Sequence, residues 1–332
     1  TLSISVRILT ENRAEALALL KTALIKPRFD TEAVERVRQQ VLSILASNAQ
    51  DPTDTAQRVW AEQAFGDHAY GASYQGTESS ITALTRADLL AAHQNLLVRD
   101  AVSVSAVGDI TAEELGPILD DLLGDLPAGS ALESPPLELD IPAGLTLVDI
   151  TTPQSVAIFG HRGIDRADPD FFAAFILNTI LGGNGIESRL TAEVREKRGL
   201  TYGISTVLLT KDHANVMLGQ VASANDRIGA AIEVIRDEWS KLAHDGVTAE
   251  ELQAAQTYLT GAYPLRFDGN SQIARILVGM QRQGLGLDYI NTRNARIKAV
   301  TLSEINRVAA RLLQPEALNF VVVGQPTGLK EE

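Results

Sequence analysis

One stretch of this chain occurs twice, and the repeat limits the folds that are open to it. Ile81–Gly108 aligns with Ile297–Gly324 without a gap, at an offset of 216 residues (81 to 297). ITALTRADLLAAHQNLL corresponds to IKAVTLSEINRVAARLL, and VSVSAVGD corresponds to LNFVVVGQ. Both copies predict a helix that begins at a threonine, Thr85 or Thr301, followed by a short buried strand ending in Val-Gly. Because the register is shared through helix, loop and strand, the repeat indicates a tandem duplication.

The repeat divides the chain into an incomplete first domain and a complete second one. Residues 126–144 (LPAGSALESPPLELDIPAG) are rich in proline and predict an extended, exposed linker. We therefore expect the C-terminal part of a first domain at 1–125 and a whole second domain at 145–332. The second copy begins directly after the linker, so the offset places the start of the first copy about 70 residues before Thr1.

The second copy predicts an α+β fold. LTLVDITT, SVAIFGHRG, YGISTVLL and ANVMLGQVA have the composition of strands, and the last two predict a hairpin across the polar turn Thr-Lys-Asp-His. Two long helices follow, starting at Asp226 and Thr248, and then come the repeated helix and strand. This order predicts a largely antiparallel sheet flanked by helices.

Composition excludes several classes of protein. A chain of 332 residues usually forms two domains. Its net charge of −13 argues against binding to nucleic acid or to an anionic membrane surface. No apolar run approaches the roughly 18 residues that a membrane span needs. The chain has no cysteine, which excludes disulfides, thiolate zinc sites and cysteine nucleophiles.

Arg195 and Tyr202 are the candidate site residues. They stand seven residues apart in TAEVREKRGLTYGIS, where Gly199 is placed to end a helix and Tyr202 to open the next strand. A guanidinium beside a phenol is a pair of hydrogen-bond donors suited to a peptide carbonyl or a developing oxyanion. The spacing alone is more typical of a helix-capping arginine and a half-buried strand tyrosine.

The surrounding sequence favours the functional interpretation. Residues 171–202 read FFAAFILNTILGGNGIESRLTAEVREKRGLTY. The apolar helix, Leu-Gly-Gly, Ser-Arg-Leu and Val-Arg-Glu-Lys-x-Gly-Leu-x-Tyr closely resemble the second domain of pitrilysin-type zinc peptidases, the inverzincins, which include insulysin and the mitochondrial processing peptidases. The resemblance covers essentially the whole chain. It implies a tandem repeat of two-layer α/β rolls, in which Arg195 and Tyr202 bind substrate backbone at a zinc site carried by another domain or subunit.

The sequence offers no zinc site of its own. None of the five histidines forms an i, i+4 pair, and the family's H-x-x-E-H motif would precede Thr1. The resemblance places the family's third ligand, a glutamate, at Ile44 and its supporting glutamate at Val37, on a predicted helix over 31–48. Neither side chain has a donor atom for zinc. Glu32 or Glu35 would become a ligand only if the register slipped, which would turn the predicted apolar face of the helix outward.

Three functions follow as hypotheses. In the first, the chain binds no metal and is one subunit of a heterodimeric zinc metalloendopeptidase for unfolded peptides, with zinc in the partner subunit and Arg195 and Tyr202 acting in trans. In the second, it is a truncated piece of a self-sufficient zinc peptidase of the same family. In the third, it is a non-catalytic structural or peptide-binding protein. The resemblance implies a periplasmic location, and nothing in the sequence contradicts a cytoplasmic one.

Overall fold

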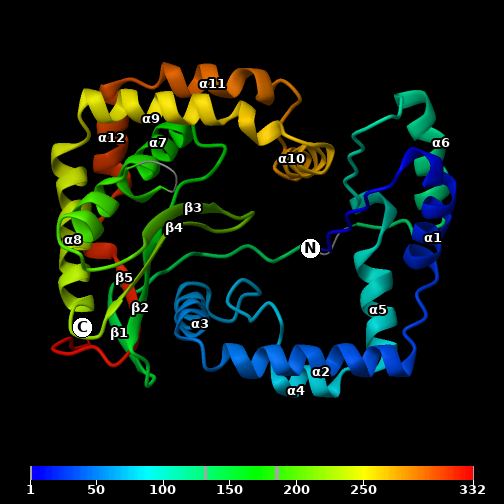
Figure 1. Cartoon of the computed structure of the whole chain (residues 1–332), viewed down its shortest axis with the longest axis horizontal. Helices are drawn as coiled ribbons and strands as arrows, with labels where there is room; N and C mark the ends of the chain where they lie inside the picture. Colours follow the sequence, from blue (N-terminus) through cyan, green and yellow to red (C-terminus); the bar gives the residue numbers. More distant parts are fainter. Residues whose placement is uncertain (1, 131–132, 184–186, 332) are drawn as a thin grey trace. The chain divides into compact units, whose positions relative to one another are not determined.

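The computed structural model describes residues 2–130, 133–183 and 187–331. The chain divides into two compact units, each assembled from three separate segments (Figure 1). Unit 1 comprises residues 1–42, 77–133 and 263–290, and unit 2 comprises residues 43–76, 134–262 and 291–332. The predicted domain limits of 1–125, 126–144 and 145–332 come from the sequence repeat, whereas the two units are defined by their compactness. The predicted limits therefore stay a prediction.

Unit 2 contains a five-stranded sheet in the order β1-β5-β2-β4-β3. The strands are β1 Gly144–Asp149, β2 Gln154–Arg162, β3 Ile204–Thr210, β4 Asn215–Ala224 and β5 Asn319–Gly324. Only the pairing of β1 with β5 is parallel; β5 with β2, β2 with β4 and β4 with β3 are antiparallel. The largely antiparallel sheet is confirmed, and so is the β3–β4 hairpin, in which Thr210 pairs with Asn215.

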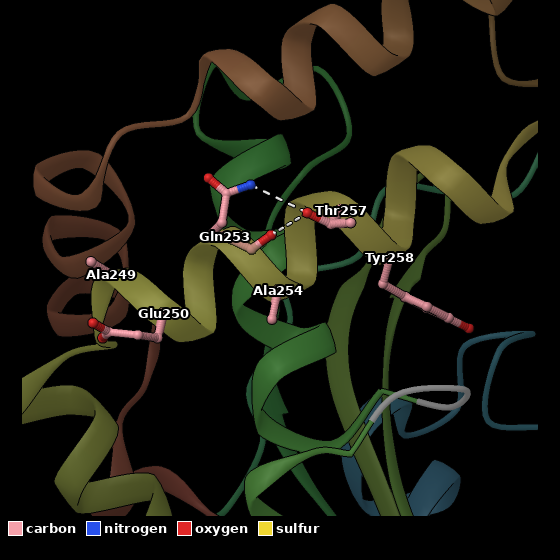
Figure 2. Close-up of a pocket in the computed structure, with 6 residues that line it drawn as sticks. All are labelled: Ala249, Glu250, Gln253, Ala254, Thr257 and Tyr258. Carbon is pink, nitrogen blue, oxygen red and sulfur yellow. Dashed lines mark hydrogen bonds between the residues drawn. The ribbon is translucent and has the colours of Figure 1, made fainter.

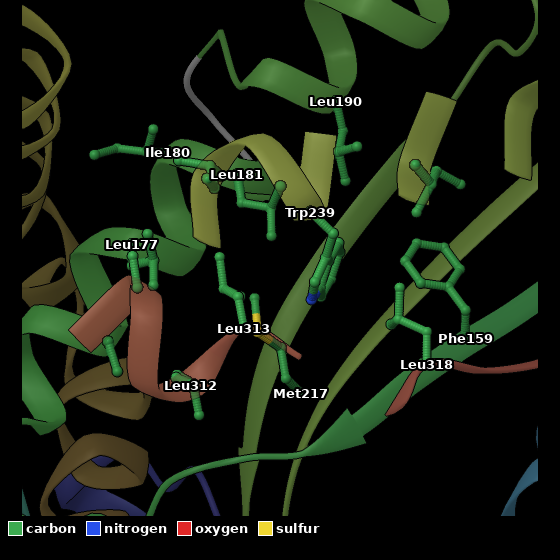
Figure 3. Close-up of a cluster of buried hydrophobic side chains, with 14 of the residues drawn as sticks. Phe159, Leu177, Ile180, Leu181, Leu190, Met217, Trp239, Leu312, Leu313 and Leu318 are labelled. Atoms are coloured by element: carbon green, nitrogen blue, oxygen red, sulfur yellow. The ribbon is translucent and has the colours of Figure 1, made fainter. Parts of the chain in front are cut away.

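Helices cover one face of this sheet around a large apolar core. They are α7 Phe171–Gly182, α8 Ile228–Asp245, α9 Ala249–Ala262, α11 Tyr289–Ala299 and α12 Leu302–Leu312. α7 and α8 contact the strands, α12 packs on both of those helices, and α9 packs on α7. Phe159, Met217 and Trp239 lie at the centre of the core and are fully buried (Figure 3). The α+β class is confirmed.

A helix that the sequence did not assign to this sheet covers its other face. α3, Pro52–Phe65, begins with Asp51 as N-cap and Pro52 in its first turn. α3 lies across the sheet from α8 (Figure 1). Its buried side chains pack against alternate residues of the strands. This second core contains Ala56, Trp60, Ala64, Phe65, Val156, Ile158, Val216, Val321 and Val323. Burial on both faces explains the continuous apolar run of β5.

The two copies of the repeat agree in their helices and differ in their strands. α5, Arg86–Leu96, and α12 both begin with a capping box, formed by Thr85 and Thr301. β5 is a fully buried strand, but the matching residues 103–108 are not a strand. The predicted strand at this place is wrong. The segment bonds to a helix instead, α10 Asn270–Arg282: the carbonyl of Val104 accepts from Gln281, and the hydroxyl of Ser105 donates to the carbonyl of Ala274. A strand needs the backbone of a neighbouring strand to pair with.

The remaining helices belong wholly or partly to unit 1. They are α1 Arg13–Ile25, α2 Thr31–Asn48, α4 Glu78–Ala83 and α6 Ala112–Leu123. α2 has the predicted range, but it buries none of its residues, so its predicted apolar face is at most half-buried. None of the helices in the described residues combines the length and the apolar character that crossing a membrane requires.

Replacing Trp60 by alanine tests whether α3 is part of the unit 2 core. Trp60 is 2% exposed, and removing a buried tryptophan side chain typically costs about 3–5 kcal/mol. We expect a loss of that size in the free energy of unfolding, measured with urea. Tyr74→Ala is the control, because Tyr74 is 93% exposed. Equal effects of the two substitutions would contradict the assignment of α3 to this core.

A buried histidine ties β2 to α8. The indole Nε1 of Trp239 donates to Nε2 of His161 at 2.9 Å. Nε2 therefore carries no proton, and Nδ1 donates to the carbonyl oxygen of Arg162 at 2.7 Å. Burial lowers the pKa of His161 below its ordinary value of 6.5.

This histidine makes the stability of the protein depend on pH. Below pH 6.5 the unfolded chain binds a proton that folded His161 does not, so the free energy of unfolding falls as the pH falls, by at most about 1.4 kcal/mol per pH unit. We expect His161→Gln, which has no titrating group, to flatten the dependence between about pH 5 and about pH 7. Urea unfolding at several pH values measures this, and identical slopes in the two proteins would refute it.

Candidate functional site

Arg195 lies on a π-helical turn whose buried side is fixed in the core. The turn spans Thr191–Glu196, and the amide of Lys197 donates to the carbonyl of Ala192 at 2.9 Å, an i to i−5 bond. Val194 is fully buried, whereas Arg195 is exposed. π-helical turns occur often at functional sites.

Gly199 ends this turn, as the sequence predicted. Its φ is +60°, in the left-handed region that favours glycine. The amide of Gly199 donates to the carbonyl of Arg195, and the amide of Leu200 donates to the carbonyl of Val194, both at 2.9 Å. These bonds close the helix directly behind Arg195.

Tyr202 lies just outside the sheet. The sequence predicted that Tyr202 opens the strand, but β3 begins two residues later, at Ile204. Its side chain is 89% exposed. Arg195 and Tyr202 therefore come from one short segment, with Arg195 on the turn before Gly199 and Tyr202 on the approach to β3.

Glu193 binds the two cationic side chains that follow the turn. Glu193 accepts hydrogen bonds from Lys197 at 2.5 Å and from Arg198 at 2.6 Å. The Arg198 bond, followed by the Lys197 bond, lowers the pKa of Glu193 to about 2. Neither the Arg195 guanidinium nor the Tyr202 hydroxyl has a hydrogen bond or ion pair with any residue that the structure describes. Both donors are free to bind a carbonyl or an oxyanion.

The residues predicted to stand at the family's metal positions offer no ligand for zinc. Val37 and Ile44 are 48% and 38% exposed on α2 and carry no donor atom. Glu35 accepts from Gln39 at 2.8 Å and from Arg38 at 3.0 Å, and these bonds lower its pKa. The described parts of the chain contain no group of three or more His, Cys, Asp or Glu side chains arranged to bind a metal ion.

A pocket on unit 2 is lined by a single helix. Its lining residues do not include Arg195 or Tyr202. Figure 2 shows its lining along α9. Gln253 and Thr257 are hydrogen-bonded to each other there, at 3.2 Å between their side chains. The lining comprises Ala249, Glu250, Gln253, Ala254, Thr257 and Tyr258. A lining from one helix face, with Glu250 as its one charged side chain, does not make an active site.

Substituting Gly199 tests the geometry that closes the turn. A Cβ at Gly199 would meet no atom within 4 Å, so only its backbone conformation opposes alanine. We expect Gly199→Ala to lower the free energy of unfolding by about 1–2 kcal/mol, the cost of a left-handed residue. Gly203→Ala is the control, because its Cβ would also meet nothing and its φ is not in that region. Equal urea midpoints for the two variants would contradict this geometry.

Comparison with known proteins places the chain in a family. Residues 83–259 match the family model described as Peptidase M16 inactive domain. An uncharacterized zinc protease of Mycobacterium tuberculosis is 29% identical over 303 residues, which cover 90% of this chain and 69% of that protein. A non-peptidase homolog of Helicobacter pylori is 25% identical over 323 residues, covering 97% of this chain and 74% of that protein.

A solved structure agrees with these matches. The crystal structure of a peptidase M16 inactive domain from Pseudomonas fluorescens superposes with a TM-score of 0.86 and 25% identity, covering 97% of this chain and 76% of that one. The resemblance to zinc peptidases inferred from residues 171–202 is therefore confirmed. Since the family model covers more than half of the chain, this protein belongs to the peptidase M16 inactive-domain family.

Proposed function

We propose that this chain is the non-metal-binding subunit of a heterodimeric zinc metalloendopeptidase. The observation that carries the proposal is the exposure of two donors, Arg195 and Tyr202, which have no partner among the described residues and stand on a backbone anchored in the core. An exposed tyrosine and an arginine without an acidic partner contribute little to folding. They are suited to a ligand that arrives from outside the chain.

The proposed division of labour gives each subunit one part of the reaction. The chemistry that zinc would supply, if bound by the partner, is activation of the attacking water molecule. Arg195 and Tyr202 of this chain donate hydrogen bonds to the substrate backbone and to the oxyanion that forms when water adds to the peptide carbonyl. Neither donor needs to change its protonation state. The resemblance to the family also leads us to propose the periplasm as the compartment.

The position of β3 supports a peptide as the substrate. β3 is an edge strand of the sheet, because it pairs with β4 alone. An edge strand presents unpaired amide and carbonyl groups, to which an extended peptide can add as a further strand. β3 begins two residues after Tyr202, and Val207 and Leu209 on this strand are exposed. The strand along which an unfolded segment would bind therefore begins two residues after Tyr202.

A non-catalytic role is the second candidate. The Helicobacter pylori relative is named a non-peptidase homolog, and this chain covers 74% of its length. In this role the chain would bind peptides or assemble with another protein, and Arg195 and Tyr202 would have no effect on cleavage.

Two substitutions test the proposed catalysis. The complete natural protein is mixed with the zinc-binding member of the family from the same organism, and the cleavage of a quenched unfolded peptide is followed. Loss of one oxyanion donor typically lowers kcat by about 10²–10³. We expect a decrease of this size for Arg195→Ala and for Tyr202→Phe, without a change in unfolding midpoint.

Tyr74→Phe is the matched control for Tyr202→Phe. Tyr74 is exposed to the same degree and loses the same hydroxyl, so we expect the wild-type rate. If Arg195→Ala and Tyr202→Phe also cleave at the wild-type rate in an active mixture, the two residues are not donors at the zinc site and the non-catalytic role is favoured.

A further inference from the structure

The backbone on either side of Tyr202 is held by side chains that the catalytic proposal does not use. Ser223 of β4 donates from its hydroxyl to the carbonyl oxygen of Leu200. Arg227 donates to the carbonyl of Gly199 at 3.5 Å. Thr201, which is 7% exposed, lies directly before Tyr202 and makes the largest number of these bonds.

The hydroxyl of Thr201 bridges two backbone segments. Its Oγ1 lies 2.6 Å from the carbonyl oxygen of Ala222 and 2.9 Å from that of Gly203. A hydroxyl has one proton to donate, and Thr201 donates it in the shorter contact, to the carbonyl of Ala222. Oγ1 also accepts from the amide of Gly203 at 3.0 Å. Thr201 therefore links β4 to the residue on the far side of Tyr202.

This bridge stands where the pairing of β3 and β4 stops. The last pair in this direction is Ile204 with Val221. Ala222 is the next residue of β4, and its carbonyl accepts a hydrogen bond from the Thr201 hydroxyl. The chain can therefore stay outside the sheet up to Gly203, while the carbonyl of Ala222 and the amide of Gly203 both keep a hydrogen-bond partner. As a result Tyr202 projects into solvent from a fixed loop.

We propose that Thr201 is a positioning residue, which fixes the phenol of Tyr202 for hydrogen bonding in the reaction. This inference rests on the proposed function. Thr201 is buried, and it acts through the backbone of Tyr202 and Gly203. Misplacing a catalytic group by about 1 Å can lower a rate about 10²-fold. A side chain with 89% exposure has no packing of its own to hold it in place.

The test replaces the Thr201 hydroxyl and keeps the shape of the side chain. In the assembled enzyme we expect Thr201→Val to lower kcat by between about tenfold and about 10²-fold, with little change in KM, because the loss is in positioning. Thr201→Ser keeps the hydroxyl and is expected to restore most of the rate. Hydrogen exchange at the Gly203 amide should accelerate in Thr201→Val, since that amide loses its acceptor, and should stay slow in Thr201→Ser.

Thr206→Val is the matched control. Thr206 is another buried threonine, five residues along the same segment, and its Oγ1 has no hydrogen-bond partner. Removing an unpaired hydroxyl is close to neutral or stabilising. For Thr206→Val we expect the wild-type kcat and the wild-type rate of hydrogen exchange at the Gly203 amide. If Thr201→Val and Thr206→Val lower kcat equally, removing a threonine hydroxyl in this region lowers the rate by destabilising the fold. That result overturns the positioning role.

The double variant separates this inference from the proposed function. If Thr201 acts only through the phenol, Thr201→Val combined with Tyr202→Phe cleaves no more slowly than Tyr202→Phe alone. A loss of activity in Tyr202→Phe with normal activity in Thr201→Val overturns the positioning role and leaves the proposed function intact. Normal activity in both Tyr202→Phe and Arg195→Ala overturns the proposed function, and the positioning role falls with it.

Discussion

The burial of both faces of the central strands is the constraint on which unit 2 depends. Alternate residues of β2 and β5 point into two separate cores, one under α7, α8 and α12 and the other under α3. Phe159 and Phe320 stack in the first core, with ring centroids 5.2 Å apart. A one-residue slip of either strand would exchange the two sets of side chains. Their register is therefore strongly specified, and it fixes β4 and β3 beside them.

The candidate site uses this fixed register at the edge of the sheet. Leu190 and Val194 anchor the π-helical turn in the first core, and both are fully buried. β4 then holds the following loop through the carbonyl of Ala222 and the hydroxyl of Ser223. Arg195 and Tyr202 are among the side chains that this anchored segment turns to solvent. A rigid backbone below two free donors is the arrangement that lets hydrogen bonds form without reorganisation.

The sequence predicted the local features of the fold well. Gly199 as a helix end, the helix starts at Thr85 and Thr301 and the β3–β4 hairpin all rest on short-range chemistry, and all are present. Long-range partners could not be predicted in the same way. The pattern of Val102–Val107 is typical of a strand, but a strand forms only beside another strand, and α10 occupies that place.

The same limit applies to α3 and to the site. α3 precedes the sheet strands by about 80 residues or more, and its amphipathic pattern does not say which sheet it covers. Arg195 and Tyr202 were found through family resemblance, because an Arg and a Tyr at this spacing are common in structural roles. The bridge from Thr201 to Ala222 was missed, since a threonine before a Tyr-Gly pair carries no signal of a contact with a strand some twenty residues away.

The central claim is that this chain contributes to a zinc site that it does not contain. Its most direct test is to count zinc in each separately purified protein, and to measure peptide cleavage by each alone and by the mixture. The account predicts no zinc and no cleavage for the complete natural protein alone, zinc in the partner, and cleavage only when the two are combined. About one zinc per molecule of this protein, together with cleavage in the absence of the partner, would contradict it.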